Sequence, residues 1–360
     1  MKPRERIMAT LMGEEPDKIP VVAADWLRKG SQGGWSRRLM ERGLGIIRWV
    51  SPYKPFFIHP HNMNPQIEGI DFTQKFFVEK GTAKCRNTFD TPVGSLTELL
   101  RFNKLDFGAC ATEENLVKEP SDWRVMNYIF RASLDKLAPN YEPFELEEDE
   151  LGDNGMTFAV VEKTPFQRSF VELASTERTI MDFAEKPDDF IEFLDIQRKL
   201  HERIAEIVAG CPAKFVEIVD HISDVISPAY YKEYCIPYYE IYSNSLKGTG
   251  KILGVHMDGR FGHIKKEVVN APFNVVESFT VPPLGDLSIT EAKEIWPDKM
   301  LFVNCPPHLN WAEPKDVRNG FSSILEEWGS KKGLIIEHSE EIPLETLETN
   351  LSCALDVFGY

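Results

Sequence analysis

Short β-rich runs alternate with longer amphipathic segments through the second half of the sequence. The runs are Thr157–Val161, Phe215–Asp220, Lys251–His256, Phe273–Phe279, Met300–Cys305 and Leu334–Glu337. The segments between and after them include Thr179–Ala209, Pro228–Lys247, Gly262–Asn270, Ser288–Trp296, Pro314–Gly329 and Leu344–Phe358. Strands that alternate with helices form parallel βα units, and repeated units of this kind close into a barrel or build a doubly wound sheet.

The N-terminal half of the sequence favours the barrel. Lys18–Ala24 is an apolar run typical of a first strand, and neither a GxGxxG motif nor a phosphate-binding loop follows it. Phe76–Val78 and Thr88–Leu96 are β-rich runs separated by turn-like residues, which indicates antiparallel strands. We therefore predict the α/β class, as a (β/α)8 TIM barrel with an antiparallel β excursion near residues 66–100. We expect a single domain over residues 1–360.

The composition of the chain indicates which classes of binding partner and which cellular compartment to expect. The formal net charge of −16 and the lack of a basic stripe argue against a nucleic-acid partner. No run reaches the roughly 18 apolar residues that a membrane-spanning helix requires. The six cysteines form no CxxC pair, and the polar N-terminal segment does not resemble a signal peptide. We therefore expect a cytoplasmic protein with reduced thiols and no membrane association.

Polar side chains gather where the late strands end. In (β/α)8 enzymes these ends share one open face, and the active site is built there. The residues at these positions are Asp220, His221, His256, Asp258, Glu277, Cys305, Glu337, His338 and Glu340. They include imidazole, thiol and carboxylate groups, which are the ligand types of zinc. Structural alternatives stay open, for example Cys305 as a small core side chain or Glu340 as a solvated carboxylate.

Several motifs spread over nearly the whole chain resemble one family. They are Arg4–Arg6, Gly13–Pro20, Asp90–Gly94, Ser227–Tyr231 with Ile236–Tyr238, Gly254–Gly259 and Glu277–Leu287. On these motifs the chain resembles the uroporphyrinogen decarboxylase superfamily, nearer its corrinoid-dependent methyltransferases of the O-demethylase type than the true decarboxylases. The decarboxylases hold substrate carboxylates with an arginine-rich loop, RQAGRY, whereas residues 26–34 here retain only Arg28 and Lys29. A porphyrinogen with many carboxylates is therefore disfavoured.

The resemblance implies a zinc ion. The related methyltransferases bind zinc through a His-x-Cys pair at the end of the sixth strand and a later cysteine. This sequence has His256 at the first position, Asp258 in place of the first cysteine, and Glu340 or the adjacent Ser339 in place of the second. Some O-demethylase relatives use an acidic residue and a cysteine on the next two strands, which Glu277 and Cys305 resemble. We expect zinc bound by Glu277, Cys305 and one of His256, Asp258 or Glu340.

The resemblance also implies a reaction. We expect methyl transfer from a small methylated donor, such as a methoxyaromatic compound, to the Co(I) corrinoid of a partner protein. Asp220, His221 or His256 is expected to donate a proton to the leaving oxygen. The residues expected to bind the substrate are Trp26, Arg28, Tyr53, Gln167 and Arg168. A second copy of the chain is a further candidate partner.

Two other functions stay open at this point. One is a metal-free decarboxylase of a small or porphyrin-type acid, in which Arg28 and Arg168 would anchor the substrate. The other is a non-catalytic barrel that binds a small ligand. Release of carbon dioxide without a corrinoid would indicate the decarboxylase, whereas a site with neither metal nor turnover would indicate the binding protein.

Overall fold

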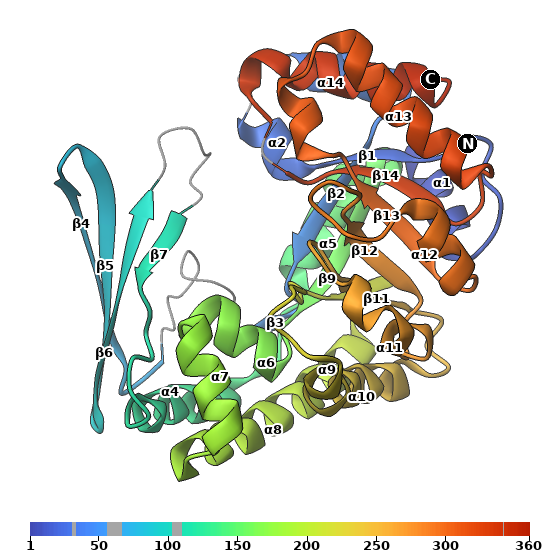
Figure 1. Ribbon diagram of the computed structural model, residues 1–360. Coiled ribbons are helices and arrows are strands. Elements are labelled where there is room, and N and C mark those ends of the chain that lie inside the picture. Colours follow the sequence, from blue (N-terminus) through green and yellow to red (C-terminus); the bar gives the residue numbers. More distant parts are fainter. Residues whose placement is uncertain (31–33, 56–66, 103–109, 341) are drawn as a thin grey trace.

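Eight parallel strands close into a barrel in the computed structural model, in the order β1-β14-β13-β12-β11-β10-β9-β2 (Figure 1). The structure describes residues 1–30, 34–55, 67–102, 110–340 and 342–360. The barrel strands are β1 (Val21–Ala24), β2 (Gly45–Val50), β9 (Gly155–Val161), β10 (Phe215–Ile218), β11 (Ile252–His256), β12 (Val275–Phe279), β13 (Met300–Asn304) and β14 (Leu334–His338). The predicted (β/α)8 barrel is confirmed, although the sequence did not predict β2.

Helices surround the strands. They are α1 (Pro3–Leu11), α2 (Asp25–Gly30), α3 (Trp35–Arg42), α4 (Asp122–Lys136), α5 (Glu142–Leu151), α6 (Pro165–Arg168), α7 (Thr176–Glu185), α8 (Asp188–Gly210), α9 (Pro228–Tyr234), α10 (Ile236–Leu246), α11 (Lys265–Val269), α12 (Ile289–Ile295), α13 (Pro314–Trp328) and α14 (Leu344–Val357). The segment predicted as one helix over 179–209 is divided between α7 and α8, because Lys186 takes a φ of 48° and Pro187 follows it. Among the described residues, no helix is long and apolar enough to cross a membrane.

An antiparallel sheet stands beside the barrel, at the left of Figure 1. It consists of β4 (Asp71–Glu79), β5 (Thr82–Thr91), β6 (Gly94–Phe102) and β7 (Cys110–Glu114), in that order. Helix α4 packs against β5 and β6. The predicted antiparallel excursion is therefore confirmed. A second small sheet pairs β3 (Tyr53–Lys54) with β8 (Ala138–Pro139).

The interior of the barrel is arranged in layers that place the site. Because side chains alternate along a strand, residues two positions apart on one strand lie in successive layers. One buried apolar layer comes from four alternate strands and consists of Ile47, Phe215, Val275 and Ile335. Two residues later on the same strands come Trp49, Glu217, Glu277 and Glu337. The barrel therefore changes from apolar to acidic near the carboxyl ends of its strands.

Candidate functional site

A cavity of about 600 Å³ opens at the carboxyl ends of the barrel strands. Its lining combines aromatic, acidic and imidazole side chains. The lining residues are Trp26, Trp49, Val50, Ser51, Val160, Glu217, Val219, His221, His256, Asp258, Ser339 and Glu340. Ligands of (β/α)8 proteins bind at this end of the barrel, which makes the cavity the candidate site.

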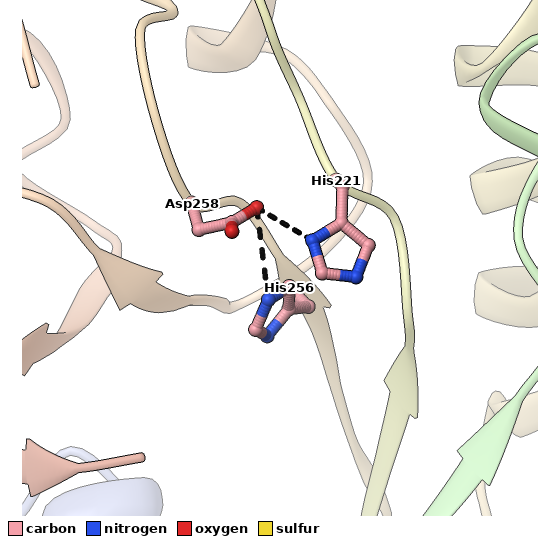
Figure 2. Close-up of side chains that lie close together, drawn as sticks. All are labelled: His221, His256 and Asp258. Atoms are coloured by element: carbon pink, nitrogen blue, oxygen red, sulfur yellow. Dashed lines mark hydrogen bonds and ion pairs between the residues drawn. The ribbon is translucent and has the colours of Figure 1, made fainter. Parts of the chain in front are cut away.

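Two histidines and an aspartate meet at the cavity (Figure 2). His256 is the last residue of β11, Asp258 follows two residues later, and His221 lies just beyond β10. The Nδ1 atom of His221 lies 2.9 Å from Oδ1 of Asp258, and Nε2 of His256 lies 3.7 Å from the same oxygen. All three side chains are partly exposed to the cavity. Their donor atoms therefore converge on one open point.

The other ring nitrogen of His256 faces two glutamates inside the barrel. Its Nδ1 lies 2.5 Å from Oε2 of Glu277 and 3.9 Å from Oε1 of Glu217. Burial alone would lower the pKa of His256, but the negative charge of Glu277, with further contributions from Asp258 and Glu217, raises this pKa to about 10. The interaction with His256 in turn holds the pKa of Glu277 below its usual range despite burial. These two residues therefore form a buried ion pair beneath the cavity.

Three glutamates share the acidic layer, and His256 pairs with one of them, Glu277. Glu217, Glu277 and Glu337 are at most 1% exposed. Burial, followed by repulsion from Glu277, raises the pKa of both Glu217 and Glu337 well above the usual value. Trp49 donates its indole N–H to Glu217 at 3.0 Å. Glu337 and Glu277 share a side-chain hydrogen bond, which requires a proton on one of the two carboxyl groups. Such carboxylates are expected to carry protons or to face a cation.

The backbone is irregular next to this layer. Ser278, directly after Glu277, has a φ of 59°, and the pairing of β12 with β13 shifts register between Val276 and Phe279. A positive φ is costly for a residue with a side chain, and such positions concentrate at functional sites. Ser278 then accepts a hydrogen bond from Asn304 at 3.1 Å, which ties the irregular strand to its neighbour.

The residues present fit a divalent metal ion. Two sets of possible ligands occur among the described residues, His221–His256–Asp258 and Glu217–His256–Glu277. The first set faces the open cavity, whereas both glutamates of the second are buried. Three nitrogen or oxygen ligands with one open side are typical of catalytic zinc. The first set has this arrangement, with Glu277 on the opposite nitrogen of His256 as a second layer of support.

Five of the residues predicted for the site line the cavity: Trp26, His221, His256, Asp258 and Glu340. Glu277 lies directly beneath them against His256. Glu340 accepts a hydrogen bond from Asn304 at 3.0 Å, and burial raises the pKa of its carboxyl group.

Cys305 does not line the cavity with the other predicted site residues. Its side chain is 1% exposed, and its sulfur lies 3.7 Å from Oδ1 of Asn310. Cys305 belongs to neither ligand set of the described residues, and burial raises the pKa of its thiol far above the usual range. The reason is strand alternation, because the preceding residue, Asn304, contacts Glu340 at the mouth of the barrel. The geometry therefore does not support the expected pairing of Cys305 with Glu277 in one metal site.

Asp220 and Arg28 also lie outside the cavity lining. Asp220 is fully buried and accepts hydrogen bonds from the backbone N–H of Thr164 at 2.7 Å and the hydroxyl of Tyr239 at 2.8 Å. Burial raises its pKa to about 6. Arg28 pairs with Asp25 at 2.6 Å. The hydrogen bonds of Asp220 therefore fix the backbone directly before His221. Arg28 is paired with an acidic residue and does not line the cavity.

The remaining predicted substrate-binding residues are core residues. Tyr53, Gln167 and Arg168 are all at most 2% exposed and do not line the cavity. Arg168 pairs with Glu162 and lies near Glu172, so its positive charge is compensated by glutamates inside the protein. The geometry does not support a role for these three in gripping a substrate.

Trp49 and Glu217 line the cavity, and sequence reasoning missed both. Glu217 interrupts the apolar run Phe215–Asp220, and a charged residue inside a barrel strand is the same signal that identified Glu277. Trp49 could not be found in this way because β2 itself was not predicted.

Comparison with known proteins agrees with the fold. Residues 113–358 match the family described as uroporphyrinogen decarboxylase (URO-D). The solved structure of a methyltransferase from Methanosarcina mazei matches with a TM-score of 0.58 and 16% identity, over 100% of both chains. At this identity the likeness shows the fold. A solved IolI protein with a bound zinc atom matches 65% of this chain and 84% of its own at 14% identity, and its TM-score of 0.34 is too low to carry an argument. No curated protein matches the sequence.

Proposed function

The chain belongs to the uroporphyrinogen decarboxylase family, and on that basis we propose that it transfers a methyl group from a small methylated donor to the Co(I) corrinoid of a separate protein. The observation that carries this proposal is the set of His221, His256 and Asp258, open to a cavity at the barrel mouth. The likeness in fold to a methyltransferase supports it. The cavity lining supports it as well, because no described lining residue is a lysine or arginine that could hold the carboxylates of a porphyrinogen.

His221, His256 and Asp258 would hold a zinc ion. When bound there, zinc supplies Lewis acidity, which stabilises the negative charge that develops on the donor heteroatom as the methyl group leaves. Glu277 accepts a hydrogen bond from Nδ1 of His256, and zinc would bind at Nε2, which faces the cavity and would lose its proton when the metal binds. The interaction of His221 with Asp258 orients both side chains toward the same point.

The experiment measures metal content and methyl transfer on the same preparation. We expect about one zinc per chain by elemental analysis, and methylation of cob(I)alamin by a panel of methyl ethers and methylated amines. His221→Ala and Asp258→Asn should each reduce zinc content and activity at least about tenfold, whereas His263→Gln, on the exposed surface, should not. Full activity in a strong chelator, or release of carbon dioxide without a corrinoid, would refute the proposal.

A further inference from the structure

Strand β4 forms an edge of the antiparallel sheet. It pairs with β5 over nine consecutive residues, from Asp71 opposite Asp90 to Glu79 opposite Thr82, without a register shift. Among the described residues it pairs with no other strand, and it lies at the outer side of the sheet in Figure 1. The backbone N–H and C=O groups on the side away from β5 therefore face no described strand and can pair with another chain.

The two edges of the sheet differ in their protection against such pairing. Natural edge strands avoid association by being short, by containing a bulge or by presenting charged side chains. Strand β7, at the other edge, has all three features, because it spans five residues, shifts register against β6 between Leu99 and Leu100, and carries Glu113 and Glu114. Strand β4 has nine residues, a regular register and no proline. The charges that β4 does carry determine how a second strand can pair with it.

Exposed apolar side chains also distinguish β4. Phe76 and Val78 are 67% and 72% exposed, and Val78 is the most exposed of the large apolar side chains that the structure describes. Because side chains alternate along a strand, both lie on the same face of the sheet. Neighbouring exposed apolar side chains on a long, regular edge strand are typical of an association surface.

We propose that β4 pairs antiparallel with β4 of a second copy of the chain, about a twofold axis at Phe77. In this register Lys75 of each copy lies opposite Glu79 of the other, and Phe76 lies opposite Val78. The two four-stranded sheets then join into one continuous sheet. Because the same edge is used on both copies, the twofold axis closes the assembly as a dimer.

Charge selects this register. A twofold axis at Lys75 would place the two Lys75 side chains opposite each other and Asp71 opposite Glu79, and both arrangements are repulsive. An axis at Phe76 would place Lys75 opposite Phe77, without a partner of opposite charge. Of these three axes, only the one at Phe77 brings opposite charges together, and it does so at both ends of the paired segment.

Both charged side chains can accept such a partner. Lys75 lies opposite Arg86 on β5, and this second cation already pairs with Glu114 at 3.1 Å. No ion pair of Lys75 occurs in the described part of the chain. Glu79 contacts Lys84 through Oε2 at 2.8 Å but remains 55% exposed, which leaves surface for a second cation. Exposed ion pairs contribute little free energy, so these charges specify the register, while backbone hydrogen bonds and apolar contacts supply the affinity.

Charge reversal tests the register in the full chain. Lys75→Glu and Glu79→Lys should each weaken dimerisation at least about tenfold, because like charges then face each other at both ends of the paired segment. The double variant Lys75→Glu/Glu79→Lys should return to within about threefold of the native chain, which an axis at Lys75 would not allow. Lys266→Glu makes the same reversal on the exposed surface of α11 and should change dimerisation less than about twofold. Sedimentation equilibrium over a range of concentrations measures each dissociation constant.

A mixture of the two single variants provides a test that does not depend on the folding of the double variant. Each single variant should be mainly monomeric alone, whereas the equal mixture should form a mixed dimer, because every charged pair across the axis is then attractive. Amide hydrogen exchange locates the surface in the native chain. Residues 75–79 should exchange at least about fivefold more slowly at a concentration that favours the dimer, and residues 110–114 of β7 should not change.

Three results would overturn the proposal. The first is a native chain that is still monomeric at about 0.5 mM, a concentration at which even a weak specific dimer is populated. The second is a dimer whose dissociation constant survives both single charge reversals. The third is a dimer that slows amide exchange in another part of the chain and leaves β4 unchanged.

Discussion

His256 presents a different ring nitrogen to each of two groups. Its Nδ1 lies against Glu277, and its Nε2 lies 3.7 Å from Asp258 at the cavity. A carboxylate that accepts the Nδ1 proton fixes the tautomer of the ring, so Nε2 is the atom left to bind a metal. The sequence led us to expect Glu277 as a ligand, whereas the geometry favours a positioning role in which it acts through His256.

Replacement of Glu277 tests this role. Glu277→Gln should weaken zinc binding about 10- to 100-fold without abolishing it, because the ligands stay in place and only their orientation suffers. Competition of the protein with a chromophoric chelator measures the affinity. A direct ligand would behave differently, so a complete loss of zinc, as expected for Asp258→Ala, would contradict the positioning role.

At the residue scale, the sequence predicted where along a strand a side chain lies better than where it points. His221, His256, Asp258 and Glu340 follow strand ends, and the shared open end of a barrel brings such residues together. The direction of Cys305 depends on strand alternation in the folded barrel, because Asn304 takes the position toward Glu340. A single sequence does not reveal which of two adjacent residues turns inward when neither is clearly apolar.

At the scale of elements, β2 shows why a strand can escape prediction. Its sequence, Gly45–Val50, is apolar except for Arg48, and a charged residue inside a short run lowers its resemblance to a buried strand. The structure buries Arg48 to 3% exposure and pairs it with Asp25 at 3.1 Å. The partner comes from the beginning of α2, so only the fold shows that the charge is compensated.

The buried pair leads to a stability prediction. Arg48→Met should lower the free energy of unfolding by about 3 kcal/mol, because the buried Asp25 loses one of its two arginine partners, keeping only Arg28, and Glu147 loses its partner Arg48. Arg38→Met is the matched control, since Arg38 pairs with Glu348 on the surface and should cost less than about 1 kcal/mol. Urea unfolding of both variants measures the difference, and equal losses would contradict the structural role of β2.

The antiparallel sheet contains a carboxyl group whose pKa is raised by burial. Glu98, in β6, is buried and accepts a hydrogen bond from Asn87 at 2.7 Å. Burial raises its pKa from 4.5 to about 7. Because the folded protein holds this proton more tightly than the unfolded chain does, the contribution to stability is present below about pH 4.5 and is lost as pH rises through 7.

Replacement of Glu98 by glutamine should therefore have a pH-dependent effect. Glu98→Gln should stabilise the protein at pH 8 by on the order of 2 kcal/mol, since glutamine keeps an acceptor for Asn87 and has no charge to bury. At pH 4.5 the variant and the native chain should be nearly equal. Unfolding by urea at the two pH values gives the comparison, and an equal effect at both would show that ionisation of Glu98 is not the cause.

At the scale of the whole molecule, the barrel could be predicted because alternation of strands and helices is a regularity that extends over many residues. The acidic layer could not, because it depends on which strands contribute to one level of the closed barrel. Glu217, Glu277 and Glu337 lie far apart in the sequence and meet only after closure places their strands alternately. Sequence reasoning identified Glu277 as a site residue but not the layer to which it belongs.

A metal ion at the barrel mouth should stabilise the whole molecule, because its ligands follow two different strands and the unfolded chain does not hold them together. Zinc at about 100 times its dissociation constant should add about 2.7 kcal/mol to the free energy of unfolding and raise Tm by a few degrees. Calorimetric scans with and without zinc measure the shift, which a chelator should reverse. The shift should vanish in His221→Ala combined with His256→Ala and persist in His263→Gln. If the double variant kept the full shift, the stabilising zinc would be bound elsewhere, and the site at β10 and β11 would lose its support.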